Sequence, residues 1–133
     1  MWDGWIKAAA ASPEIRVADC QYNAAQIQKT MQQAGERGAQ LLVLPELCLT
    51  GYTCQDLFLQ QSLIDQAKRA LSELAAFSHA CSVLTIVGLP MQWEGKVYNC
   101  AAVVYRGKLL GVVPKTHLPN YGEFYERRHF MPT

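Results

Sequence analysis

The run Leu41-Leu42-Val43-Leu44 constrains the fold more than any other feature of the sequence, because it contains four apolar residues without alternation. A strand with one face in water alternates apolar and polar side chains, whereas a strand of a helix-covered parallel sheet is apolar on both faces. Four residues are also too few for a buried helix. The run therefore predicts a strand buried on both faces in an α/β protein.

Helical periodicity precedes this run. Ile27, Met31 and Ala34 follow one another at spacings of four and three, which places them on one apolar stripe of a helix. Asn23 and Gln26 have the capping-box spacing, so we expect this helix to begin at Asn23.

A second helix and further strands are also predicted. The helix extends from about residue 57 to residue 80, and its apolar stripe consists of Leu63, Ala67, Leu71 and Leu74. Apolar, β-rich segments predict strands at residues 5–11, 15–17, 83–89, 97–105 and 109–113. Strand, helix, strand, helix and a three-stranded meander predict an α/β fold with a mixed sheet.

The composition describes a globular chain of one domain. The chain has 133 residues, of which 50% are hydrophobic and 17% charged, with a formal net charge of +1. We expect neither a nucleic-acid nor a membrane partner, because the basic residues form no long cluster and no apolar run approaches about 20 residues. The N-terminus lacks the pattern of a signal peptide, so the expected compartment is the cytoplasm.

Five cysteines are present, an odd number, and no two of them have CxxC spacing. Disulfide scaffolds and zinc sites show other patterns. We therefore expect five reduced thiols, no disulfide and no metal site.

Two predicted strands end in the same way, with proline and then one charged residue. Leu41–Leu44 is followed by Pro45 and Glu46, and residues 110–113 are followed by Pro114 and Lys115. Proline cannot donate to a strand ladder, and α/β sheets hold their ligands beyond the carboxyl ends of strands. We expect the two charged tips at one edge of the sheet, within about 4–6 Å of each other. The alternative is that each charge only begins a solvated loop.

Such a pair has a definite chemistry. A carboxylate beside a lysine can transfer protons when a nucleophile lies nearby, and the lysine can stabilise an oxyanion. A cysteine would be the natural third member.

These segments resemble the nitrilase superfamily of carbon–nitrogen hydrolases. The resemblance is carried by Leu44-Pro45-Glu46-Leu47 with Thr50-Gly51-Tyr52, and by Pro114-Lys115-Thr116-His117-Leu118-Pro119. The family uses a Glu-Lys-Cys triad on a four-layer αββα sandwich. The resemblance therefore implies the front half of such a sandwich, a mixed sheet with helices on one face.

Further segments look like the glutaminase domain of glutamine-dependent NAD synthetase. They are Gly51-Tyr52-Thr53-Cys54, Asp56-Leu57-Phe58, Val97-Tyr98-Asn99-Cys100-Ala101-Ala102 and Asn120-Tyr121-Gly122-Glu123-Phe124-Tyr125. Gln55 departs from the family, which has a small residue there. The resemblance implies that residues 1–133 are an N-terminal fragment of the domain. The nucleophilic cysteine would lie several tens of residues past Lys115, whereas the chain ends eighteen residues past it (133 − 115).

The resemblance also implies residue roles. Glu46 would be the general base, Lys115 would hold the oxyanion, and Glu123 would be a supporting carboxylate. Three aromatic residues would line a glutamine pocket: Tyr52, Tyr121 and Phe124. For His117 we expect packing, because no acidic orienter is evident. Cys48 and Cys54 lie near Glu46 in the chain, but the family places its nucleophile elsewhere.

The implied longer protein would hydrolyse glutamine through a thioester and pass ammonia to a C-terminal synthetase domain. That domain would amidate deamido-NAD with ATP and magnesium, whereas this fragment would need no cofactor. Homo-oligomers are expected by resemblance, and the fragment alone is expected to be inactive. Two alternatives remain: a stand-alone nitrilase-family amidase acting on another small amide, and a truncated, non-catalytic interaction module.

Overall fold

A computed structural model of the chain describes residues 4–118, 120–121, 124–125 and 129–132, and it describes no side chain between residues 119 and 128. One five-stranded sheet has the order β1-β2-β3-β4-β5. Its strands are β1 (Ala8–Ala10), β2 (Leu41–Val43), β3 (Leu84–Trp93), β4 (Lys96–Tyr105) and β5 (Lys108–Pro114). The first three strands are parallel, and β4 and β5 continue the sheet as antiparallel hairpins. The mixed sheet is as predicted.

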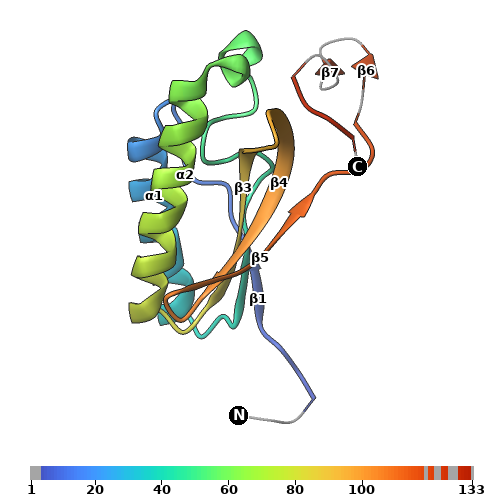
Figure 1. The fold of residues 1–133 in the computed structure, drawn as a ribbon. Helices are drawn as coiled ribbons and strands as arrows, with labels where there is room; N and C mark the ends of the chain where they lie inside the picture. Colours follow the sequence, from blue (N-terminus) through green and yellow to red (C-terminus); the bar gives the residue numbers. More distant parts are fainter. Residues whose placement is uncertain (1–3, 119, 122–123, 126–128, 133) are drawn as a thin grey trace.

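Two helices, α1 (Cys20–Glu36) and α2 (Gln61–Phe77), lie side by side on one face of this sheet (Figure 1). Two 3-10 helices flank α2: η1 (Gln55–Leu59) and η2 (Ser78–Ala80). The single helix predicted over residues 57–80 is therefore divided into three pieces. A separate two-stranded ladder is formed by β6 (Asn120–Tyr121) and β7 (Phe124–Tyr125).

The core lies between the helices and the sheet. The predicted stripe of α1 is buried, with Ile27 and Met31 0% exposed. The predicted stripe of α2 is buried as well, and its Leu74 is 0% exposed. On the sheet, Val87 and Val104 meet these helices from neighbouring strands and are also fully buried. The period of 3.6 residues thus identified both buried helix faces correctly.

The predicted start of α1 is wrong by one turn. The helix begins at Cys20, and the Asp19 side chain caps it by accepting a hydrogen bond of 3.1 Å from the backbone N–H of Tyr22. Asn23 is fully buried inside the helix, and its amide nitrogen donates to the backbone oxygen of Leu49 at 3.0 Å. Asp19 therefore caps the helix in place of Asn23, because both residue types can accept a hydrogen bond from a helical N–H.

Residues 15–17 are not a strand, contrary to the prediction. The backbone N–H of Arg16 donates to Asn23 Oδ1 and its carbonyl accepts from Asn23 Nδ2, both at 2.8 Å. These backbone groups are satisfied by a side chain instead of a sheet neighbour, so the segment remains a loop.

The second face of the sheet is open in the described part of the chain. Val43, on the run expected to be buried on both faces, is 40% exposed, and Val113 is 63% exposed. By strand register Val43 stands beside Ile86, which stands beside Val103. The expectation of burial on both faces is therefore wrong for the elements described. The composition of the face is nonetheless that of an interior, since these residues carry no charge.

Candidate active site

The strand–proline–charge ends of β2 and β5 meet at one edge of the sheet. Both strands run in the same direction, so their carboxyl ends lie together. Glu46 is the third residue after β2, and Lys115 follows β5 directly. Lys115 Nζ lies 2.7 Å from Glu46 Oε1, and the two side chains are 30% and 42% exposed, respectively. The predicted juxtaposition of the two charged tips at one edge of the sheet is confirmed, and the ion pair is closer than the expected distance.

Gly88 on β3 positions the loop that carries Glu46. A Cβ at Gly88 would overlap the backbone nitrogen of Leu47 and lie 2.8 Å from the carbonyl oxygen of Pro45. The backbone N–H of Leu49 donates to the Gly88 carbonyl at 3.0 Å. The loop therefore rests directly on the strand backbone, which only glycine permits. Sequence reasoning missed this residue, although an isolated glycine within a strand is a signal of close backbone approach.

Asn99 on β4 joins both members of the pair. Its side-chain nitrogen donates to Glu46 Oε1 at 2.6 Å, and its carbonyl oxygen accepts from the backbone N–H of Lys115 at 2.7 Å. Asn99 is 3% exposed. Sequence reasoning did not assign it a role. The available signal was a carboxamide within an apolar strand, since a buried polar group needs a partner.

Residues 7–133 match the carbon–nitrogen hydrolase family, so the match includes every residue of this site. The chain belongs to the carbon–nitrogen hydrolase family.

Relatives within this family are similar over nearly the whole chain. The glutamine-dependent NAD(+) synthetase of Mycobacterium tuberculosis is 40% identical over 129 residues, 97% of this chain and 19% of the relative. The synthetase of Thermotoga maritima is 38% identical over 96% of this chain and 22% of its own length. The chain thus spans about a fifth of these relatives.

Solved structures agree with the fold. A glutamine-dependent NAD(+) synthetase from Cytophaga hutchinsonii superposes with a TM-score of 0.90 at 34% identity, over 96% of this chain and 22% of that one. An amidase from Nesterenkonia sp. superposes with a TM-score of 0.77 at 25% identity, over 96% of this chain and 48% of that one. The carbon–nitrogen hydrolase chain therefore has the α and β layers of part of a nitrilase-type domain, as predicted.

The cysteines of this carbon–nitrogen hydrolase chain are unsuited to attack. Burial raises the pKa of Cys48 from 9.0 to about 11, and it also raises the pKa of Cys54. Cys48 is 2% exposed, with its Sγ 3.8 Å from the Gly88 carbonyl oxygen. Both thiols are therefore protonated near neutral pH, and the thiolate is the nucleophilic form. The five cysteines are unpaired in the structure.

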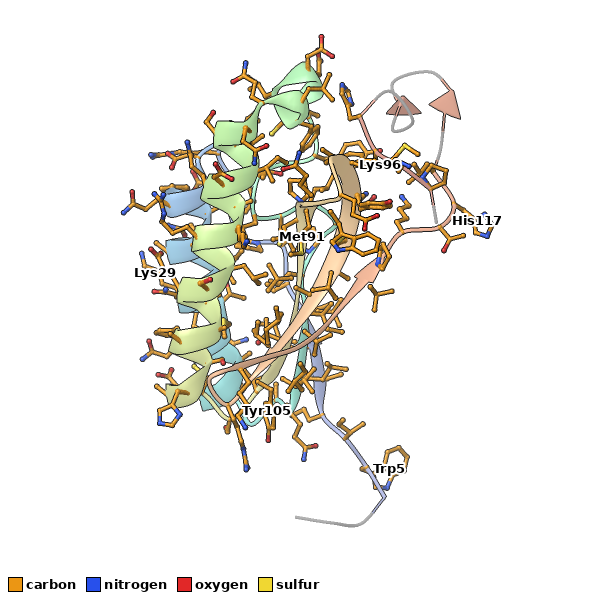
Figure 2. All side chains as sticks on the ribbon, viewed as in Figure 1. Trp5, Lys29, Met91, Lys96, Tyr105 and His117 are labelled. Carbon is orange, nitrogen blue, oxygen red and sulfur yellow. The ribbon has the colours of Figure 1, made fainter. Side chains whose placement is uncertain are left out.

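The remaining predicted site residues lie on two loops. Tyr52 is partly buried against the core. The backbones of Tyr121 and Phe124 pair with each other across β6 and β7, while their side chains and the whole of Glu123 lie outside what the structure describes. His117 is exposed and points away from the sheet, contrary to the expected packing (Figure 2).

Two described residues on either side of Glu123 in the sequence bond to β4. Lys115 N–H bonds to the Asn99 carbonyl, and Met131 N–H bonds to the Val97 carbonyl at 2.8 Å. The two acceptors are two residues apart on one strand, so Lys115 and Met131 both lie against the same end of β4.

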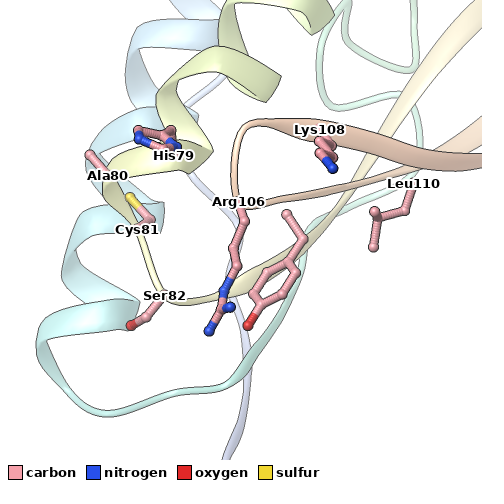
Figure 3. A pocket seen from close by; sticks show the side chains of 8 residues that line it. His79, Ala80, Cys81, Ser82, Arg106, Lys108 and Leu110 are labelled. Carbon is pink, nitrogen blue, oxygen red and sulfur yellow. The ribbon is translucent and has the colours of Figure 1, made fainter.

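A cavity of about 640 Å³ lies at the opposite end of the sheet (Figure 3). It is lined by His79, Ala80, Cys81, Ser82, Tyr105, Arg106, Lys108 and Leu110. Residues of η2 and of the segment that follows it line one side, and residues of the β4–β5 hairpin line the other. The cavity is thus separate from the Glu46–Lys115 edge.

Among the residues whose placement is described, no group of three or more His, Cys, Asp or Glu side chains could hold a metal ion. No helix in the same part of the chain has the length and apolar character needed to cross a bilayer.

Proposed function

We propose that this chain is the N-terminal part of a glutaminase domain in a glutamine-dependent NAD synthetase. The observation that carries the proposal is the 2.7 Å ion pair between Lys115 and Glu46, in a chain 40% identical to a synthetase of that name. The domain would supply ammonia for the ATP- and magnesium-dependent amidation of deamido-NAD elsewhere in the longer protein. We expect that protein in the cytoplasm.

The pair has two of the three groups that amide hydrolysis through a thioester requires, a base and a cation that can hold an oxyanion. Glu46 would take the proton of a cysteine thiol, supplied from beyond residue 133, as its sulfur attacks the amide carbon. The ammonium of Lys115 would stabilise the resulting oxyanion. Glu46 would then return the proton to the departing nitrogen, which leaves as ammonia with the acyl group on sulfur. Finally, Glu46 would accept a proton from the water that attacks the thioester. It would return this proton to the departing sulfur, so that glutamate leaves and the thiol is restored.

Four further residues are proposed to support this scheme. Glu123 is proposed as a second carboxylate, and Tyr52, Tyr121 and Phe124 as the walls of the glutamine pocket. The open apolar face of the sheet, which includes Val43, is proposed to pack against the rest of the same domain. Burying that face would remove apolar surface from water at about 25 cal/mol per Å².

A stand-alone amidase acting on another small amide is the second candidate. The superposition on the Nesterenkonia amidase supports it, since this chain covers 48% of that protein. The synthetase is favoured because its TM-score is 0.90 compared with 0.77.

The test is ammonia release by the full-length gene product, with glutamine, asparagine and simple amides as substrates. We expect hydrolysis of glutamine, and NAD formation from deamido-NAD with glutamine as nitrogen donor. Hydrolysis of another amide without glutamine turnover would establish the stand-alone amidase instead. If the protein hydrolyses no amide, the remaining hypothesis is the non-catalytic interaction module.

A chain cut after Thr133 is expected to release no ammonia from glutamine, because Glu46 and Lys115 cannot supply a thiolate. Turnover by this short chain above that of its Glu46→Gln variant would show that Cys48 or Cys54 is the nucleophile. The proposed triad would then be wrong.

A further inference from the structure

Asn99 is one of five buried polar residues in the described chain, and its side chain reaches the ion pair. The atom 2.6 Å from Glu46 Oε1 must be the amide nitrogen, because an amide oxygen would repel a carboxylate oxygen at that distance. Lys115 Nζ donates to the same oxygen at 2.7 Å. Donors from two neighbouring strand segments therefore hold one oxygen of the carboxylate.

The backbone of Asn99 acts on the other member of the pair. Its carbonyl oxygen accepts from the Lys115 N–H at 2.7 Å, directly after β5 ends at Pro114. One residue thus fixes the orientation of the Glu46 carboxylate and the point where Lys115 leaves the sheet. A residue serving only the fold would need no side-chain bond to the reactive carboxylate.

We propose that Asn99 is a positioning residue, whose amide holds the Glu46 carboxylate at the angle needed for proton exchange with the nucleophile and the leaving nitrogen. This inference rests on the amidase function proposed above. A glutamate side chain has several rotatable bonds, and proton transfer requires hydrogen-bond distance and alignment. Without the amide, Oε1 would lose one of its hydrogen-bond donors, and the carboxylate would be held less firmly at this angle.

The first test replaces the amide in the full-length protein. Asn99→Leu, similar in size but without a donor, should lower kcat about 10- to 100-fold, as for the loss of one hydrogen bond to a charged group. KM for glutamine should stay within about twofold, because the bond acts on proton transfer instead of substrate binding.

Thr85→Val is the matched control. It also replaces a buried polar side chain by an apolar one of similar size. Thr85 lies on β3, five positions before Pro90, and Pro90 is the register partner of Asn99. It should leave kcat unchanged. A folded Asn99→Leu protein with the kcat of the control would overturn the inference.

The second test is a pH profile of Asn99→Asp, which keeps the shape of the side chain. When ionised, the new carboxyl group repels Glu46, but when protonated it can donate the missing hydrogen bond. The ratio of wild-type to variant kcat/KM should therefore fall as pH falls from about 8 to about 5. A ratio that does not change with pH would indicate a structural role only and contradict the proposal.

The third test does not depend on activity. In full-length protein labelled with ¹⁵N-asparagine, the Asn99 side-chain amide signal is assigned by its loss in Asn99→Leu. One of its protons should resonate downfield and move upfield in Glu46→Gln, because a neutral amide is the weaker acceptor. No response to Glu46→Gln would overturn the inference even in an active enzyme. If the protein has no glutaminase activity but its Asn99 signal shifts in Glu46→Gln, the proposed function is wrong and the Asn99–Glu46 hydrogen bond is established.

Discussion

Glu46 Oε1 accepts hydrogen bonds from Lys115 Nζ at 2.7 Å and from Asn99 Nδ2 at 2.6 Å. Both donors hold the carboxylate in one orientation, which suits the proposed role of Glu46 as a base. The site is only partly shielded in the described chain, with the Glu46 side chain 42% exposed. Further exclusion of water would strengthen both contacts, because Coulomb interactions grow as the local dielectric constant falls.

Glu46→Gln should reduce glutamine hydrolysis by about 10²- to 10⁴-fold in the full-length protein, the range for loss of a general base. KM should change little, since the shape of the side chain is kept. Steady-state ammonia release gives both constants. A variant with wild-type kcat would exclude Glu46 as the base.

The raised pKa of Cys48 predicts that the stability of the folded chain depends on pH. Its pKa is raised from 9.0 to about 11 by burial, so between these values the unfolded chain releases a proton that the folded chain retains. Stability linked to Cys48 is therefore fully present below about pH 9 and is lost as pH rises toward about 11, by up to about 2–3 kcal/mol.

The measurement is the urea midpoint of the wild type and of Cys48→Ala across this pH range. Lysine and tyrosine titrations cancel in the difference between the two proteins. The gap between their midpoints should shrink as pH rises. A constant gap would show that Cys48 does not titrate differently in the two states.

At the scale of elements, the site depends on backbone contact between β3 and the loop after β2. Leu47 has a positive φ of 54° and is 0% exposed, and its backbone nitrogen lies against Gly88. The loop therefore has little freedom to move Glu46. The strand backbone fixes the geometry of the ion pair as much as the side chains do.

Gly88→Ala should displace this loop and lower both stability, by about 1–3 kcal/mol, and kcat, although Glu46 and Lys115 are unchanged. Gly35→Ala is the control, because a Cβ at this glycine of α1, away from the open sheet face, would meet no described atom within 4 Å. Unfolding midpoints and ammonia release should separate the two variants. Equal unfolding midpoints and equal kcat in the two variants would show that the loop can move away from β3 without loss of stability or activity.

At the scale of the whole molecule, the open apolar face of the sheet is the surface on which the rest of the domain is proposed to pack. If the rest of the domain covers this face, Val43→Asp should bury an unpaired charge and strongly reduce the folded yield of the full-length protein. Val17→Asp changes the same residue type outside the sheet, at 52% exposure compared with 40% for Val43, and should be tolerated. Soluble yield and unfolding midpoint measure the difference. Equal tolerance would show that water, and no second layer, faces Val43.

Local patterns in the sequence determined the elements of this protein. The stripes that include Ile27 and Leu74 identified the buried helix faces, because helical periodicity is a property of neighbouring residues. The strand–proline–charge endings, with the family resemblance, singled out Glu46 and Lys115. Local rules failed where a distant or competing partner intervened, as when Asn23 bonded to Arg16 and Leu49 instead of starting α1.

Only the tertiary structure decided which of these elements meet. Two partners of Glu46, Asn99 and Lys115, are 53 and 69 positions away in the chain, and strand order and register bring them together. Gly88 acquired its role through the loop that rests on it, and Val43 shows which face the helices leave open. Periodicity reports which side of an element is apolar. What covers that side depends on contacts between segments far apart in sequence, which no local pattern contains.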